Sequence, residues 1–142
     1  GVIEAYIHAG SRVGAMVELN CETDFVAKTP EFKQLAHDIA MQIAAMSPIF
    51  VSKENVDEAT LQKELEIYKA QAVNEGKRPE IAEKIAEGRL EKFYQEVCLL
   101  EQSFIKDSGK TIKDLLSDAT GKVGEKIGVR RFHRYHLGES PR

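Results

Sequence analysis

The sequence predicts an α+β fold in which a three-stranded antiparallel sheet packs against helices and an antiparallel helical hairpin protrudes. Residues 2–8 and 12–19 alternate apolar and polar side chains, as half-buried strands do, and residues 127–137 form a third strand-like segment. Several stretches between them carry apolar residues at helical spacing, and two of these are roughly twenty residues long. The order strand, strand, helices, strand favours one sheet with helices packed on a face.

The first two strands are joined by Ala9-Gly10-Ser11 and predict a β-hairpin. A two-residue Gly-Ser loop would set Ile7 opposite Gly14 and split the apolar faces. A three-residue loop sets Ile7 opposite Val13, and a slip of one residue turns every side chain to the other face, so we expect the three-residue register. The expected core face then consists of Ile3, Ala5, Ile7, Val13, Ala15, Val17 and Leu19.

A long helix is predicted to begin after Thr29, with Thr29 as its cap and Pro30 at its first position. Ser47-Pro48 ends it, and residues 49–51 form a short extended piece. Its apolar stripe is Phe32, Leu35, Ile39 and Ile43.

Two further helices form the predicted hairpin. One runs from about Asp57, a plausible cap, to Gly76, and the next begins after the turn at Lys77-Arg78-Pro79. We therefore expect residues 53–98 to be a hairpin inserted into a core made of residues 1–52 and 99–142. The apolar faces of the two helices are Leu61, Leu65, Tyr68 and Ala72, and Ile81, Ile85, Phe93, Tyr94 and Val97.

The last helix is expected to begin at Thr111, which forms a capping box with Asp114, and to end at Thr120-Gly121. Residues 107–111, Asp-Ser-Gly-Lys-Thr, imitate the end of a phosphate-binding loop. The first glycine of such a loop would fall at position 104, which is Phe104. Without that glycine the backbone cannot close around a phosphate, so we reject the match.

Composition excludes several classes of protein. The chain has 142 residues, of which 42% are hydrophobic and 30% charged. This suits one ordinary globular core, or two small subdomains that share one. A net charge of −3 argues against a direct nucleic-acid partner. The sequence has no long apolar run and no recognisable signal peptide, so we expect no membrane partner.

The cysteines and histidines do not predict a cofactor or a metal site. Cys21 and Cys98 lie far apart and are expected to be reduced thiols, with a disulfide within or between chains as the alternative. His133 and His136 lie on opposite faces of the expected last strand, and the other histidines have no paired ligand. We find no motif for a catalytic nucleophile. Acid/base catalysis by two carboxylates that lie far apart in the sequence stays open as an alternative.

The last strand supplies the alternative function. In residues 129–136 basic residues are interleaved with aromatic residues, as in RNA-binding sheets. The two faces are mixed: Arg131, His133, Tyr135 and Leu137 lie on one, and Arg130, Phe132, Arg134 and His136 on the other. An RNA-binding module is therefore the second hypothesis.

Residues 20–26, Asn-Cys-Glu-Thr-Asp-Phe-Val, connect the second strand to the long helix. In a connecting segment Phe25 either packs into the core or points outward as an anchor for a partner. Burial is the commoner outcome, because large aromatic side chains gain most of their free energy by leaving water. Asp24 places a carboxylate directly beside the ring.

This segment resembles the signature of the elongation factor Ts family, and the resemblance extends over residues 2–139. The further matching segments are Tyr6-Ile7-His8 with Gly10 and Arg12-Val13-Gly14, residues 79–85 with Glu87-Gly88-Arg89, Glu101-Gln102 with residues 104–107 and 110–112, and residues 131–139. The chain is thereby identified as a member of that family.

The resemblance implies a guanine nucleotide exchange factor that binds elongation factor Tu in its GDP form and promotes GDP release. It implies that Phe25 wedges between helices of the GTPase domain and that Asp24 acts near the magnesium site. His8 is implied as a second contact, whereas Asn20, Thr23 and Val26 shape the segment. Such a factor makes and breaks no bond and uses no cofactor.

Two departures from the family pattern shape the remaining expectations. The small helical domain with which members usually begin is not found in this sequence, and one core is found where larger members have two. The chain thus resembles the short type, which is expected to form a homodimer and a 2:2 complex with elongation factor Tu. The expected compartment is the cytoplasm of a bacterium, or the matrix or stroma of an organelle.

Overall fold

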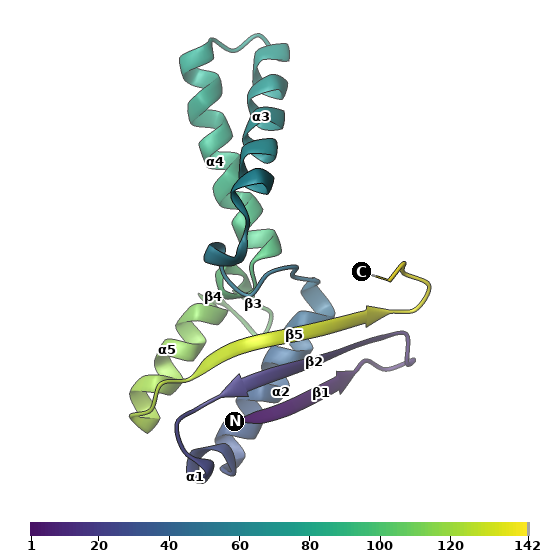
Figure 1. Ribbon diagram of the computed structural model, residues 1–142, viewed down its shortest axis with the longest axis vertical. Helices are drawn as coiled ribbons and strands as arrows, with labels where there is room; N and C mark the ends of the chain where they lie inside the picture. The colour runs from purple at the N-terminus through teal and green to yellow at the C-terminus, as the bar shows by residue number, and fades with distance from the viewer. Residues whose placement is uncertain (142) are drawn as a thin grey trace.

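The computed structural model describes residues 1–141 and has the predicted α+β fold (Figure 1). Its main sheet has the order β1-β2-β5, in which β1 (Val2–Ile7), β2 (Val13–Asn20) and β5 (Gly128–His136) run antiparallel. Helix α2 (Pro30–Met46) packs against one face of this sheet. The strand and helix predictions for these segments are confirmed.

The predicted register of the first hairpin is wrong. Ile7 pairs with Gly14 and Ile3 with Glu18, and the last hydrogen-bonded contact joins the His8 amide to the Val13 carbonyl at 2.9 Å. Residues 9–12 form the turn, in which Gly10 and Ser11 both have positive φ. The Gly14 position leaves room for the Ile7 side chain, because a Cβ there would lie 2.5 Å from Ile7 Cδ1.

The shifted register changes which residues of β1 face the core. Val2 and Tyr6 turn toward α2, where the Tyr6 ring meets His37 edge-on with centroids 5.6 Å apart. Ile3, Ala5 and Ile7 lie on the opposite, open face of the sheet and are exposed. On β2 the prediction holds: Ala15, Val17 and Leu19 are buried and Val13 is half-buried.

Helix α2 begins and ends where its sequence indicates. The Thr29 hydroxyl accepts the Phe32 amide at 3.3 Å, Pro30 occupies the first turn, and Ser47 ends the helix with a positive φ. Its buried side is Phe32, Ala36, Ile39, Ala40, Gln42, Ile43 and Ala44. The apolar side chains among them form the main core together with the inner face of β2, Leu99, Ile112 and Leu116.

The helical hairpin comprises α3 (Glu58–Asn74) and α4 (Pro79–Val97), which pack along each other and extend away from the sheet (Figure 1). Asp57 caps α3 as predicted, accepting the Thr60 amide at 3.1 Å. Ala72, Ala82 and Ala86 are buried in the hairpin, whereas Ile81 is exposed rather than interior.

The junction between hairpin and core uses short irregular segments. The 3₁₀ turns η1 (Lys53–Asn55) and η2 (Leu99–Glu101) flank the hairpin, and Phe50 forms a parallel bridge with Cys98. Cys98 is a fully buried free thiol, and burial raises its pKa to about 11. It is therefore protonated at neutral pH. Cys21 is also a free thiol.

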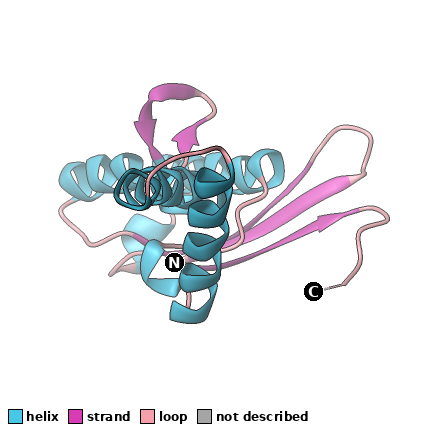
Figure 2. Ribbon diagram, turned by 90° about the horizontal axis from the view of Figure 1, so that it is seen from above, coloured by secondary structure: helices cyan, strands magenta, loops and turns pink. Residues whose placement is uncertain are grey.

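Two details of the C-terminal half were not predicted. A ribbon of β3 (Ser103–Phe104) and β4 (Asp107–Thr111) lies on the opposite side of the helices from the main sheet (Figure 2). Helix α5 (Ile112–Val123) has the predicted capping box at Thr111 and Asp114 but continues past Gly121. It ends at Gly124, whose φ of 71° supplies the left-handed cap.

Candidate functional site

The predicted segment contains one turn of helix that was not expected from the sequence. This turn, α1 (Asp24–Ala27), begins after Thr23, whose hydroxyl accepts the Val26 amide at 3.3 Å. Val26 and Ala27 are buried in the main core. Phe25 points the other way and is 82% exposed, more than any other large hydrophobic side chain among residues 1–141. The ring therefore points outward rather than into the core.

The turn is fixed by residues from the other end of the chain. Glu125, which follows α5, accepts the amides of Glu22 and Thr23 through Oε1 at 3.1 and 3.0 Å. Its Oε2 accepts the Thr23 hydroxyl at 2.7 Å. In return the Lys126 amide donates to Glu22 Oε2 at 3.1 Å. The hydrogen bond from the Thr23 side chain is the largest of the effects that hold the pKa of Glu125 below its usual value.

The other predicted residues of the segment have different surroundings. Asp24 is exposed and lies in the first turn of α1, directly beside Phe25. The thiol of Cys21 donates to the Thr23 carbonyl at 3.2 Å. The Asn20 amide group donates to Glu18 Oε2 at 3.0 Å, so Asn20 interacts with the end of the sheet rather than with the turn itself.

The structure does not bring His8 to this site. His8 follows β1, whereas Phe25 follows the far end of the antiparallel strand β2, so the length of β2 separates them, roughly 25 Å at strand spacing. The His8 ring instead shares a hydrogen bond with the Tyr6 hydroxyl at 2.9 Å, measured from Nδ1. A partner touching both residues must span one whole edge of the sheet.

The arginines of β5 are engaged within the protein. Glu18 binds Arg131 through Nε at 2.9 Å and Arg130 at 3.7 Å. Arg134 donates to the Ala44 carbonyl at 3.1 Å and pairs with Glu139 at 3.7 Å. Together these contacts leave no continuous row of uncommitted cations along the strand, which weakens the RNA-binding hypothesis.

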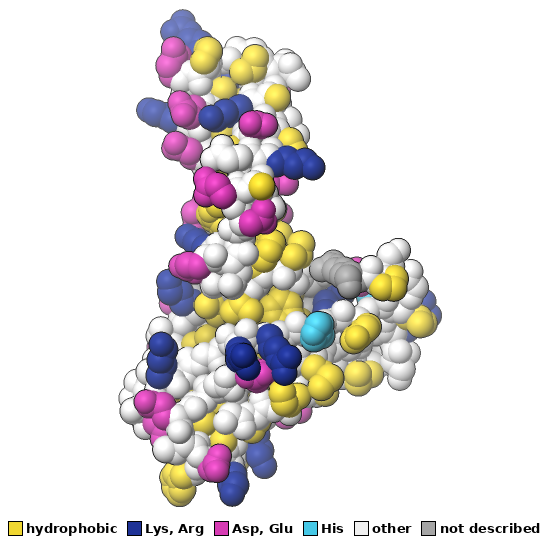
Figure 3. Space-filling view, viewed as in Figure 1, with side chains coloured by type: hydrophobic (Ala, Val, Ile, Leu, Met, Phe, Trp, Pro, Cys, Tyr) yellow, Lys and Arg dark blue, Asp and Glu magenta, His cyan; other side chains and the backbone are white. Residues whose placement is uncertain are grey.

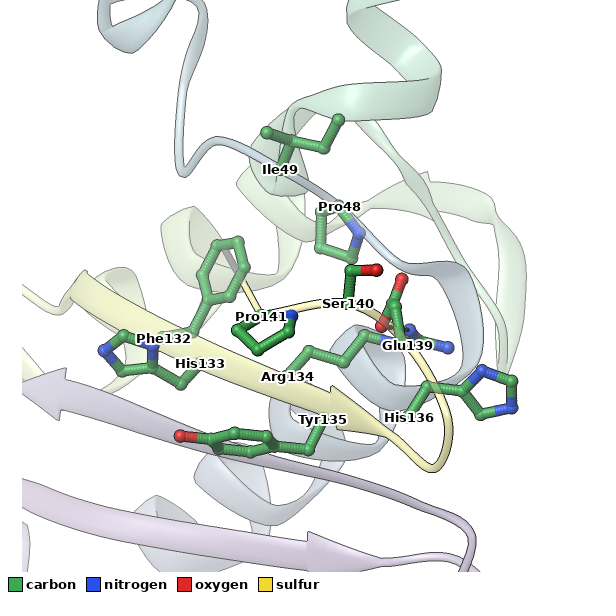
Figure 4. Close-up of a pocket in the computed structure, with 10 residues that line it drawn as sticks. All are labelled: Pro48, Ile49, Phe132, His133, Arg134, Tyr135, His136, Glu139, Ser140 and Pro141. Atoms are coloured by element: carbon green, nitrogen blue, oxygen red, sulfur yellow. Dashed lines mark ion pairs between the residues drawn. The ribbon is translucent and has the colours of Figure 1, made fainter.

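Side chains of β5 line a groove and point alternately to the two sides of the strand. Figure 4 shows Phe132 reaching toward Pro48 and Tyr135 lying across the other side of the strand. The groove has a volume of about 390 Å³ and lies between β5, Pro48–Ile49 and the chain after Glu139. It is distant in the fold from α1, so it is not part of the predicted site.

The sheet face opposite α2 is not covered by any part of residues 1–141. The exposed hydrophobic side chains on it and at its end are Ile3, Ile7, Met16, Tyr135 and Leu137. Figure 3 looks onto this face and shows hydrophobic side chains over the strands, interrupted by a small group of basic and acidic residues. We call these five residues the open sheet face.

The described part of the chain has neither a candidate metal cluster nor a helix that could span a membrane. Residues 1–141 contain no cluster of three or more His, Cys, Asp or Glu side chains arranged to hold a metal ion. In the same range, no helix combines the length and the apolar character needed to cross a membrane.

Comparison with known proteins identifies the family. The family described as Elongation factor TS matches residues 1–139. The chain belongs to the elongation factor Ts family. It is 60% identical over 139 residues to elongation factor Ts of Carboxydothermus hydrogenoformans and likewise to that of Desulforamulus reducens. It is 58% identical to elongation factor Ts of Moorella thermoacetica.

These elongation factor Ts proteins are longer than the chain. The alignments cover 98% of this chain but 64% of the first two relatives and 68% of the third. The family prediction made from the signature residues is confirmed over nearly the whole chain.

Sequence reasoning missed the residues that hold the turn in place. Glu125 lies 102 positions from Thr23, and no spacing rule links them. The local sequence around Glu125 is a glycine at the end of α5 followed by an acidic residue. This pattern is common in exposed loops, so it does not indicate a contact with Thr23.

Proposed function

We propose that this chain is a guanine nucleotide exchange factor that binds elongation factor Tu in its GDP form and promotes GDP release. The observation that carries the proposal is the fully presented Phe25 ring on a turn whose neighbours Val26 and Ala27 are buried. An exposed phenylalanine on a fixed backbone gains free energy only when a partner covers it. Membership of the elongation factor Ts family supports the same proposal. Nucleotide exchange is the function that the exposed Phe25 on its fixed turn serves best.

The proposed mechanism is displacement rather than bond chemistry. Phe25 inserts between helices of the GTPase domain, and Asp24 brings a negative charge toward the magnesium site. GDP is held by phosphate contacts and by magnesium bridging to phosphate, so moving these groups removes charge-assisted interactions. By linkage, this chain must bind nucleotide-free elongation factor Tu more tightly than the GDP form. The ratio of these two affinities equals the fold by which the chain weakens GDP binding. Thr23 and Val26 support the turn, and His8 would be a separate contact.

The experiment is release of a fluorescent GDP analogue from elongation factor Tu in the presence of this chain. We expect faster release that saturates with factor concentration. A chain carrying both Arg130→Gln and Arg131→Gln should accelerate release to within about twofold of wild type, because these arginines pair with Glu18. Loss of activity in that variant, with affinity for RNA that falls steeply with salt, would favour the RNA-binding function instead.

We further propose that the chain is of the single-core type and forms a homodimer through the open sheet face, giving a 2:2 complex with elongation factor Tu. Two such faces related by a two-fold axis would form a sandwich of two sheets, each covering the other's apolar side chains. In this proposal residues 53–98 remain an inserted hairpin outside the dimer.

Sedimentation velocity tests the dimer. At micromolar concentration we expect a dimer mass for wild type and a monomer mass for Ile7→Glu, which buries a charge in the proposed interface. Ile49→Glu is the matched control, because Ile49 is exposed to a similar degree but lies off this face. A monomeric wild type, or equal behaviour of the two variants, would contradict the interface.

The proposed compartment is the cytoplasm of a bacterium, where elongation factor Tu acts in translation. It is supported by family membership and by the state of the two cysteines, which are free thiols.

A further inference from the structure

We propose that Glu125 is a positioning residue for exchange, acting through Thr23 to hold the α1 turn so that Phe25 faces the partner. The inference rests on the proposed exchange function. It concerns the region after α5, which lies outside the signature segment.

The α1 turn cannot hold its own shape. It has four residues, and an isolated helical turn is unfavourable because ordering several residues gains few hydrogen bonds. Buried Val26 and Ala27 anchor its C-terminal half. The N-terminal half, which sets the direction of Phe25, has exposed side chains at Glu22, Thr23 and Asp24 and therefore depends on polar contacts.

Glu125 supplies those contacts at the point where the turn begins. One carboxylate oxygen accepts both the Glu22 and the Thr23 amides, and the other accepts the Thr23 hydroxyl. Because the Thr23 hydroxyl donates its proton to Glu125, its oxygen is oriented to accept the Val26 amide as the helix cap. Glu125 thus orders the cap as well as the backbone.

The contact between the two segments is reciprocal, and the backbone that carries Glu125 is also held in place. Glu22 Oε2 accepts the Lys126 amide, so each segment supplies a carboxylate to the backbone of the other. Gly124 ends α5 in a left-handed conformation directly before Glu125. Ile127 is buried, and its amide donates to the Thr120 hydroxyl at 3.2 Å. Glu125 is therefore presented from a constrained backbone.

A positioning role predicts a specific kinetic pattern. Without Glu125 the turn would sample several conformations, and the apparent affinity for elongation factor Tu would fall in proportion to the fraction of molecules in the binding-competent one. Once the complex has formed, Phe25 still makes its contact. In Glu125→Ala we expect the factor concentration at half-maximal GDP release to rise roughly tenfold. The release rate at saturating factor should stay within about twofold of wild type.

The test titrates GDP release from elongation factor Tu with wild type, Glu125→Ala, Glu125→Gln and Asp118→Ala. Glu125→Gln keeps one acceptor oxygen for the two amides and should give an intermediate shift. Asp118→Ala removes the same charge from α5, where Asp118 pairs with Lys110 at 2.7 Å, and should match wild type. An unchanged half-maximal concentration in folded Glu125→Ala, or an equal shift in Asp118→Ala, would overturn the proposal.

Two further measurements separate this inference from the exchange function itself. Amide hydrogen exchange should show lost protection at Glu22 and Thr23 in Glu125→Ala, a readout that needs no partner; retained protection would overturn the positioning role. Adding Glu125→Ala to Phe25→Ala should cause no further shift in the half-maximal concentration, and an additive shift would mean that Glu125 acts elsewhere. If wild type fails to accelerate release, the exchange proposal fails while the hydrogen-exchange result still decides whether Glu125 holds the turn.

Discussion

Phe25→Ala is expected to slow factor-stimulated GDP release at subsaturating factor by at least about 30-fold, equivalent to ~2 kcal/mol. The ring is 82% exposed in the free protein, so its burial against the partner is the main apolar gain that this turn can offer. Stopped-flow release of a fluorescent GDP analogue measures the effect.

The variant should remain folded, because the ring makes little contact with its own chain. Its melting temperature should match wild type, since surface substitutions usually change stability by less than about 0.5 kcal/mol. Lys28→Ala, which changes an exposed side chain directly after the same turn, is the matched control and should retain activity. Full activity of Phe25→Ala would place the functional contact elsewhere on the protein.

Gln102→Leu is expected to destabilise the fold by about 3 kcal/mol, which lowers the melting temperature by roughly 10 °C for a chain of this size. Gln102 is 1% exposed and links three parts of the structure. Its Nε2 donates to the Glu96 carbonyl of α4 at 2.8 Å, and its Oε1 accepts Gln42 Nε2 of α2 at 3.2 Å. Leucine has similar bulk but leaves these buried groups without their partner.

Thermal unfolding followed by circular dichroism measures this change. Gln34→Leu is the control, because Gln34 is an exposed glutamine on α2 whose amide donates to Asp38 at 3.0 Å. It should change stability by less than about 0.5 kcal/mol. Equal melting temperatures for the two variants would show that the buried amide pair does not hold the hairpin to the core.

The sequence was most informative where one local feature decides the structure. Thr29-Pro30, Asp57 and Thr111 each begin a helix through a cap that depends on the nearest residues, and all three are confirmed. The signature segment likewise located the exposed Phe25 through a resemblance that covers nearly the whole chain.

The sequence failed where distant elements decide. The β1 register was inferred by keeping all apolar residues on one face, but Tyr6 rather than Ile7 packs beside His37 on the helix side. The turn at Gly10 and Ser11, with positive φ at both, fixes a pairing that leaves Ile3 and Ile7 exposed. A sheet with apolar residues on both faces does not reveal from its pattern which face its own helix covers.

The same limit explains the missing parts of the site. The Glu125 carboxylate reaches Thr23 only because β5 pairs with β2, which brings the end of α5 beside the end of β2. Periodicity and caps carry no information about such a long-range contact. The short α1 turn was missed for a related reason, since its cap is completed by that distant carboxylate.

The most direct test of the exchange proposal compares the affinity of this chain for nucleotide-free and for GDP-saturated elongation factor Tu. Both binding constants can be measured by titration calorimetry at fixed magnesium concentration. We expect much tighter binding to the nucleotide-free form, by the same factor by which the chain weakens GDP binding. Equal affinities for the two forms would contradict exchange, because a partner that binds both states equally cannot shift the nucleotide equilibrium.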